Sequence, residues 1–330
     1  MDDINQILFI VSIGLALSYA FTNGVNDAAN ALATVVGTRV LTPAAAVILG
    51  GCMNLSGAVT GTAVAKTIGK GIVDPEYMTQ AAVMAAILAA VIWVVFATRF
   101  GLPVSVSHSL VAGVLGAGFA TAGLARINDT VVIKVIMALG LSPLFGFAGA
   151  FVFMVILYWA FRNWNLSTVN RLFSKLQILS AAFLSYSHGK NDAQNAIGIM
   201  ALSLAVYSSQ EVNVELWMQI SCGLAIGLGT ALGGWRVIHT LGSKVTKLIP
   251  TSGFAANMAA AGVIEAASNI GLPVSTTHTS SSAIMGVGIT RGVLAVRWGV
   301  IKGILGAWVI TYPICTILGW VFAKLLGIVF

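Results

Sequence analysis

The sequence predicts an all-α polytopic membrane protein with about 10–12 transmembrane helices, including broken helices and re-entrant hairpins, arranged as two inverted-topology repeats. Three observations support this fold class. The 330 residues are 58% hydrophobic and only 8% charged, with a mean hydropathy of +0.95, which is far more apolar than a soluble domain. Apolar runs of about 18 residues or more, the length that spans a bilayer, recur along the chain. Two polar phrases each occur twice, in the same order.

The same composition disfavours several other classes of protein. The apolar runs lack the alternation of an outer-membrane barrel. We expect no enzyme, since there is no large polar domain, and no ATP-driven pump, since the G-x-x-x-x-G-K-[ST] loop is missing. The net charge of +7 comes from single basic residues between apolar runs, which is typical of topology signals and gives no support to a nucleic-acid partner. Three scattered cysteines predict neither a disulfide framework nor a metal site.

The first half of the chain, residues 1–161, begins with an apolar run at 7–21. We expect this helix to be interrupted at Thr22-Asn23-Gly24 and to resume up to residue 36. Thr42-Pro43 can open the next helix, because proline suits a first helical turn, and this helix is expected to reach about Lys66. The remaining helices of this half are expected at residues 78–98, 107–122 and 131–161.

An amphipathic basic segment, residues 162–177, is expected to connect this half to the second, residues 178–330. The acidic N-terminus indicates an external start, and the basic connection indicates a cytoplasmic position. Each half would then cross the membrane an odd number of times, so the halves would be antiparallel. That is the plan of secondary transporters with a midplane site. Helices of the second half are expected at residues 178–207, 216–232, 253–268, 277–289 and 299–326.

The first duplicated phrase places a carboxylate and amides in an apolar chain. GVNDAANA, which starts at Gly24, returns as GKNDAQNA at Gly189, with six of eight positions identical. An aspartate at the bilayer centre costs about 3 kcal/mol on insertion scales, so its duplication indicates a site. Carboxylate and amide oxygens suit Na⁺, whereas hydrogen bonding between helices is the alternative role. Helical spacing puts these side chains on one face: Asn23, Asp27, Asn30, His188, Asp192 and Asn195.

The second phrase, GLPVSVSHS from Gly101, returns as GLPVSTTHT from Gly271. Proline breaks a helix here, because it lacks an N–H and disfavours a helical predecessor. The hydroxyls that follow enter a new helix, whose N-terminus attracts anions; simple capping is the alternative. We expect the two copies to face each other and to hold an oxyanion, with both histidines orienting or packing. The candidates are Ser105, Val106, Ser107, His108, Ser109, Ser275, Thr276, Thr277, His278 and Thr279.

These motifs resemble those of the inorganic phosphate transporter (PiT) family over nearly the whole chain. The resemblance is carried by the two G-x-N-D-A-x-N-A copies, by SHGKNDAQNAIG from Ser187 and by SNIGLPVSTTH from Ser268. It implies secondary transport of inorganic phosphate, coupled to Na⁺ in many members and to H⁺ in others, at a site lined by the motifs of both repeats.

Carried over to this chain, the resemblance implies two overlapping sets of site residues. Asp27 and Asp192 match the signature aspartates of the family. Phosphate is expected at Ser105 to Ser109 and Ser275 to Thr279, together with Asp27, Asp192 and Gln194. The Na⁺ ligands are expected to be Asn23, Asn26, Asp27, Asn30, Asn191, Asp192, Asn195, Ser105 and Ser275.

One departure from the family pattern bears on the coupling ion. Many relatives carry a glutamate where Asn54 and Asn257 stand, and the loss of both carboxylates favours Na⁺ over H⁺. We therefore expect a Na⁺–phosphate symporter of the cell membrane, working by alternating access and without an organic cofactor. An H⁺-coupled phosphate or sulfate permease, a channel and a structural membrane protein are the alternatives. Whether the chain forms a homodimer is left open.

Overall fold

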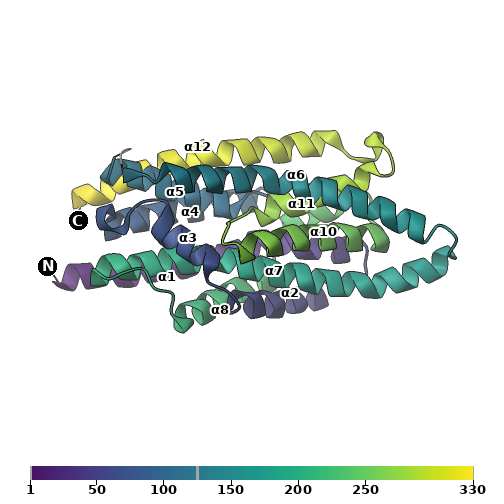
Figure 1. Ribbon diagram of the computed structural model, residues 1–330, viewed down its shortest axis with the longest axis horizontal. Helices are drawn as coiled ribbons and strands as arrows, with labels where there is room; N and C mark the ends of the chain where they lie inside the picture. Colours follow the sequence, from purple (N-terminus) through teal and green to yellow (C-terminus); the bar gives the residue numbers. More distant parts are fainter. Residues whose placement is uncertain (1, 124–125, 330) are drawn as a thin grey trace.

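The computed structural model describes residues 2–123 and 126–329 as an elongated bundle of helices (Figure 1). The only β pairings among these residues are two isolated bridges, Val73–Ile127 and Thr246–Val296. Two short helical turns, η1 (Pro75–Tyr77) and η4 (Val293–Ala295), and one π-helical turn, η3 (Thr240–Lys244), lie between longer helices. The α-helices are α1 (Asp2–Gly37), α2 (Pro43–Ala58), α3 (Ala63–Gly71), α4 (Gln80–Arg99), α5 (Val106–Thr121), α6 (Asp129–Ala160), α7 (Leu166–Ser208), α8 (Leu216–Leu232), α9 (Trp235–His239), α10 (Pro250–Asn269), α11 (Thr276–Ile289) and α12 (Trp298–Val329).

The predicted all-helical membrane class is confirmed. By length and composition α1, α4, α6 and α12 can each cross a bilayer, and two bent pairs raise the number of such spans to as many as six. The sequence predicted about 10–12 transmembrane helices, whereas four to six segments of the described chain meet the length and hydropathy of a span. In α7, for example, the polar residues 187–195 stand in the middle of the helix, where they lower the hydropathy that identifies a span.

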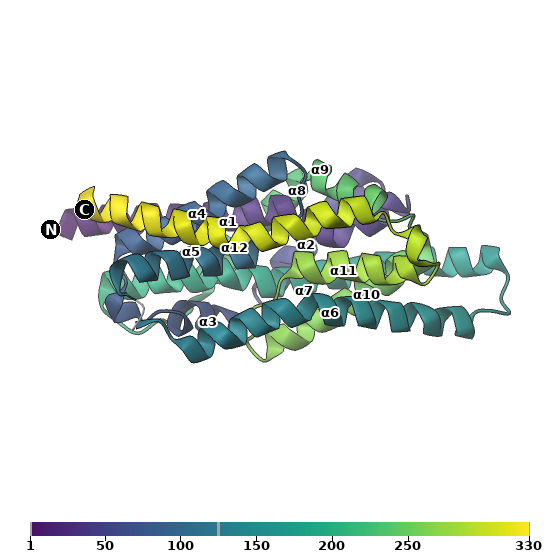
Figure 2. The ribbon, with the colours of Figure 1, turned by 90° about the horizontal axis from the view of Figure 1, so that it is seen from above.

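Both termini lie at one end of the bundle, and the α6–α7 connection lies at the opposite end (Figures 1 and 2). The elements of the first half recur in the same order in the second. Two 20-residue helices, α4 and α10, each lead through a sharp bend into α5 and α11. The 32-residue helices α6 and α12 each contain one internal proline, Pro143 and Pro313. Helix α1 begins at the end that holds both termini, and α7 begins at the opposite end (Figure 1).

The expected interruption at Thr22-Asn23-Gly24 is wrong, because α1 is helical throughout from Asp2 to Gly37. Gly24 serves close packing instead. A Cβ there would overlap the carbonyl oxygen of Ile226 in α8, and a Cβ at Gly189 would overlap that of Asn54 in α2. Each copy of the first phrase therefore starts with a glycine that lets two helix backbones touch.

Two other boundaries differ from the expected ones. The helix from Pro43 ends at Ala58 rather than near Lys66, and α3 follows after a bend of 70°. The basic segment 162–177 is not a separate connector beyond its first residues, because α7 begins at Leu166. The side chain of Asn165 caps that start by accepting a hydrogen bond of 3.0 Å from the Ser167 amide.

The bends of the two predicted hairpins, α4–α5 and α10–α11, have the same backbone form. Gly101 and Gly271 adopt φ of +69° and +73°, a region that favours glycine. Each bend is held by the other half of the chain. Thr240 donates a 3.1 Å hydrogen bond to the Gly101 carbonyl, and Thr67 donates one of 2.7 Å to the Gly271 carbonyl. These contacts place the helix starts after both bends in the interior of the bundle.

Candidate functional site

The two copies of the first phrase, which begin at Gly24 and Gly189, lie in the C-terminal halves of α1 and α7, and their polar side chains are buried. They are called the phrases from here on. Each phrase is bonded to the hairpin of the other half. The Asn30 amide donates to the Thr277 hydroxyl at 3.1 Å, and at the equivalent place the Asn195 amide donates to the Ser107 hydroxyl at 2.8 Å. The structure thus brings both phrases and both hairpins into one polar centre.

Two buried carboxylates form the middle of this centre. The Thr276 hydroxyl lies 3.3 Å from Asp27 Oδ2 and 3.0 Å from Asp192 Oδ2. A hydroxyl has one hydrogen to donate, so it can satisfy only one of these oxygens at a time. Thr276 has no hydroxyl counterpart in the first half, where Val106 occupies the matching position.

His188 stands beside the same two carboxylates. Its Nε2 lies 3.3 Å from Asp192 Oδ2 and 3.8 Å from Asp27 Oδ2, and its Nδ1 lies 2.8 Å from Asn54 Oδ1. Because the Asn54 carbonyl can only accept, Nδ1 carries a hydrogen and Nε2 is the nitrogen that faces the acids. One oxygen or nitrogen from each of Asp27, His188 and Asp192 lies within 4.8 Å of the others, a spacing compatible with a shared cation.

Several amide oxygens around this centre are buried with no hydrogen-bond partner among the described residues. They are the Oδ1 atoms of Asn23, Asn26, Asn30 and Asn195. Their nitrogens are used: Asn23 Nδ2 donates to Asp192 Oδ2 at 3.2 Å, and Asn26 Nδ2 donates to Thr98 Oγ1 at 2.7 Å. A buried polar atom left unpaired costs about 1–3 kcal/mol, and a hard cation would satisfy these oxygens. The donor set therefore fits Na⁺.

The hairpin hydroxyls fall into two groups. Ser105 and Ser275 cap α5 and α11 by accepting 3.1 Å hydrogen bonds from the His108 and His278 amides. Ser109 and Thr279 donate to backbone carbonyls of their own helices. Ser107, Thr276 and Thr277 face the phrases instead. The capping role and the site-facing role expected for this motif thus occur side by side, in different residues.

Both hairpin histidines pack among aromatic side chains. The rings of His108 and His278 lie 4.4 Å apart, and His278 stacks on Trp308 at 3.8 Å. Trp308 in turn donates to the Pro103 carbonyl at 3.0 Å. The two histidines therefore pack against the hairpin bends, and their place in the phosphate site stays a prediction.

Gln194, another phosphate candidate, bonds to the start of α3. Its Oε1 accepts hydrogen bonds from the Val64 and Ala65 amides at 2.7 and 3.1 Å. The residue before α3, Thr62, makes no capping bond with its side chain, so Gln194 satisfies the start of that helix from a distance. Its Nε2 donates to the Lys190 carbonyl at 2.6 Å, so both ends of the amide have partners within the protein, and a contact of Gln194 with phosphate stays a prediction.

An ion pair of the second half, between α7 and α10, was not expected from the sequence. Lys190 Nζ contacts Glu265 Oε1 and donates to Asn269 Oδ1 at 2.7 Å, which ties α7 to the end of α10. Val25 stands at the matching position of the first phrase. The difference between Lys190 and Val25 was the available signal, but its partner lies 75 residues away.

The two asparagines that depart from the family pattern lie behind the centre. Asn54 Nδ2 donates to Thr230 Oγ1 at 2.7 Å while its oxygen faces His188. Asn257 Oδ1 accepts from Thr34 at 3.0 Å. Neither is bonded to an aspartate of the phrases, so Asn54 acts on the centre through the orientation of His188.

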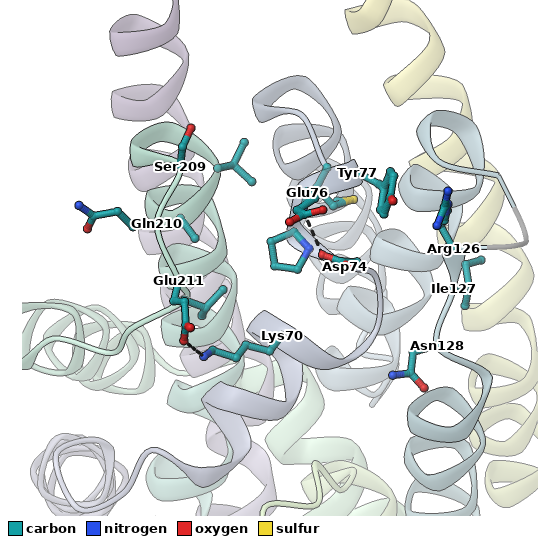
Figure 3. Close-up of a pocket in the computed structure, with 15 residues that line it drawn as sticks. Lys70, Asp74, Glu76, Tyr77, Arg126, Ile127, Asn128, Ser209, Gln210 and Glu211 are labelled. Carbon is teal, nitrogen blue, oxygen red and sulfur yellow. Dashed lines mark hydrogen bonds and ion pairs between the residues drawn. The ribbon is translucent and has the colours of Figure 1, made fainter.

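A cavity of about 970 Å³ opens at the end of the bundle that holds both termini. It lies between η1, the residues before α6 and the segment after α7 (Figure 3). An ion pair of 3.0 Å joins Lys70 to Glu211 at its wall. None of its lining residues belongs to the phrases or to the hairpins, so the cavity and the polar centre are separate features.

Comparison with known proteins agrees with this architecture. The model of the phosphate transporter family matches residues 23–170 and 162–319. A probable low-affinity inorganic phosphate transporter of Bacillus subtilis is 44% identical over 99% of this chain and 100% of its own length. One from Rhizobium meliloti is 43% identical over 93% and 92%.

A solved structure described as the sodium-dependent phosphate transporter superposes with a TM-score of 0.89 at 27% identity, covering 98% of this chain and 100% of the other. These relatives are transporters and not enzymes. Because the family model covers most of the sequence and the apolar helices are those of an integral membrane protein, the chain belongs to the phosphate transporter family.

Proposed function

We propose that this protein imports inorganic phosphate across the cell membrane by symport with Na⁺. The observation that carries the proposal is the buried pair of carboxylates, Asp27 and Asp192, on either side of the Thr276 hydroxyl. The name of the superposed sodium-dependent phosphate transporter supports both the substrate and the ion.

Charge balance supplies the reason for coupling. Two unit charges about 4 Å apart interact by roughly 4 kcal/mol at an effective dielectric constant of about 20. Phosphate brought near two buried carboxylates would be repelled by about that amount from each. Na⁺ bound by Asp27, Asp192 and the unpaired asparagine oxygens would cancel one of the two negative charges and so lower this repulsion. Phosphate therefore binds well only after Na⁺ has bound.

The phosphate would lie between the starts of α5 and α11. Ser107, Thr276 and Thr277 present hydroxyls on the side that faces the phrases. Helix N-termini add a positive dipole end without a net charge. Neutral donors of this kind can hold an oxyanion and still release it, which suits a transporter better than a fixed arginine would.

The transport step would use two inverted-topology repeats, residues 1–161 and 178–330, that rock against each other around the centre. The opposite directions of α1 and α7 and the reciprocal bonds between phrases and hairpins support this arrangement (Figure 1). Each hairpin would close the site on one side while the other opens.

Uptake of radiolabelled phosphate into proteoliposomes tests the proposal. We expect uptake to require an inward Na⁺ gradient and to be little affected by excess sulfate. Uptake that is independent of Na⁺ would remove the coupling claim, and sulfate that outcompetes phosphate would remove the substrate claim.

H⁺ coupling is the second candidate, and the contact of His188 with both aspartates favours it. A protonated imidazole could take the place of one Na⁺ beside the carboxylates. Uptake driven by an inward H⁺ gradient in Na⁺-free medium separates the two candidates. Phosphate uptake under this condition would assign H⁺ as the coupling ion, and no uptake, with uptake present under an inward Na⁺ gradient, would assign Na⁺.

A further inference from the structure

A basic groove lies on the outer side of the bundle, away from the polar centre. It is a cavity of about 310 Å³ between the bend that ends α4 and the segment formed by α9 and η3. Figure 2 shows α9 at the edge of the bundle beside α8. Arg236, His239 and Lys244 from α9 and η3 line it on one side. No carboxylate lines this groove.

The cations of the groove are not neutralised by the protein. Among the described residues, neither Arg236 nor Lys244 makes an ion pair with an acidic side chain. Arg236 Nη1 donates to the Arg99 carbonyl at the end of α4, which leaves most of its five N–H donors available. A phosphate group is the anion that such a guanidinium and a nearby ammonium bind best.

Two other lining residues are aromatic and exposed. Phe100 and Trp235 are 65% and 43% exposed. Aromatic side chains at the rim of a membrane protein typically lie at the level of lipid headgroups. A ligand with a phosphate head and an apolar tail matches both parts of the groove, whereas free phosphate matches only the cations.

The segment that lines the groove, α9 and η3, leads toward the basic end of the bundle. After η3, Thr246 forms a β-bridge with Val296, which lies just before α12. This bridge lies toward the end of the bundle that holds the α6–α7 connection. The connections at this end carry basic residues and no Asp or Glu: residues 38–42, 161–165, 245–249 and 290–297. Such an end is expected to face the cytoplasmic leaflet, where anionic lipids collect.

We propose that this groove is a binding site for the headgroup of an anionic phospholipid, held by Arg236 and Lys244 and flanked by Trp235 and Phe100. The lipid would stabilise the bent α9–η3 segment against the first hairpin, next to the hydrogen bond from Thr240 to the Gly101 carbonyl. This assignment does not depend on which ion drives transport.

Native mass spectrometry of the purified full chain, titrated with phosphatidylglycerol or phosphatidylcholine, tests the site. We expect tight retention of phosphatidylglycerol alone. Each lost cation should weaken it about fivefold, in line with the usual contribution of one Lys or Arg near an anionic surface. Lys244→Ala is the principal variant, because Lys244 makes no hydrogen bond that its loss would break, and Arg236→Ala is the second. Lys247→Ala, an exposed lysine outside the groove, is the matched control and should bind within about twofold of wild type.

Three results would overturn the proposal. Equal loss in Lys247→Ala and Lys244→Ala would reduce the effect to net charge. Displacement of the lipid by excess inorganic phosphate would assign the groove to the soluble anion. Lipid retention that is unchanged in both Lys244→Ala and Arg236→Ala would show that the groove does not hold the headgroup.

Discussion

Replacing Asp192 with asparagine isolates the charge of the polar centre from its shape. The carboxylate accepts hydrogen bonds from Asn23, Asn191 and Thr276, and an amide of the same size keeps one accepting oxygen. Removing one unit charge about 4 Å from a bound cation forfeits roughly 4 kcal/mol at an effective dielectric constant of about 20. Since about 1.4 kcal/mol is a tenfold change in affinity, we expect Na⁺ binding to weaken about a thousandfold.

The assay is the Na⁺ concentration that gives half-maximal phosphate uptake in proteoliposomes. At moderate Na⁺ the Asp192→Asn variant should show no uptake above background, with partial recovery at very high Na⁺. Its amount in the membrane and its unfolding temperature should stay close to wild type, because the substitution also relieves repulsion with Asp27. Asp129→Asn, which neutralises an exposed carboxylate at the start of α6, is the matched control.

A normal Na⁺ requirement in well-folded Asp192→Asn would refute the reasoning, because the carboxylate would then lie outside the cation site. Loss of uptake that no Na⁺ concentration restores, with unchanged Na⁺ binding measured by calorimetry, would refute it in a second way. In that case the residue would act on phosphate or on the conformational change rather than on Na⁺.

Three further substitutions test separate parts of the structure. Thr276→Val removes the hydroxyl between the carboxylates, and we expect at least about a tenfold loss of uptake, the effect of one lost hydrogen bond to a charged group; unchanged uptake would exclude a role in the site. Lys190→Met should lower the unfolding temperature, because it leaves Glu265 without its cation. Adding Glu265→Met should restore much of the unfolding temperature, since a buried ion pair can be replaced by apolar groups. A double variant as unstable as Lys190→Met alone would contradict this. Gly24→Ala should reduce the folded yield, because its methyl group would overlap a carbonyl oxygen of α8. Gly14→Ala is the control and should be tolerated, because the space around Gly14 is open. Equal yields of the two variants would show that α1 and α8 are not in tight contact at Gly24.

Local sequence patterns were sufficient for the class of fold and for the position of most helices. Predicted helices at 78–98, 216–232 and 277–289 differ from α4, α8 and α11 by no more than two residues at either end. Proline and glycine after α4 and α10 act on the backbone of their own neighbours, so both bends could be read directly. The structure brings the two copies of the first phrase together through the hairpins, since each copy bonds to the hairpin of the other half.

Glycine within α1 was ambiguous from the sequence, because the residue that can end a helix is also the residue that lets two helices touch. Only the position of α8 against Gly24 decides between these roles. In the same way, Gln194 caps a helix that begins about 130 residues earlier, and Lys190 meets Glu265 across 75 residues. Such pairings depend on which helix faces are adjacent, and no local pattern encodes adjacency.

The sequence by itself therefore determined that this is a helical membrane protein with duplicated polar motifs, because hydropathy and repetition are properties of the chain. The tertiary structure alone decided that Thr276 stands between Asp27 and Asp192 and that each phrase bonds to the hairpin of the other half. Two residues about 250 positions apart become neighbours only when the whole bundle has packed, and the chemistry of the centre exists only in that packed state.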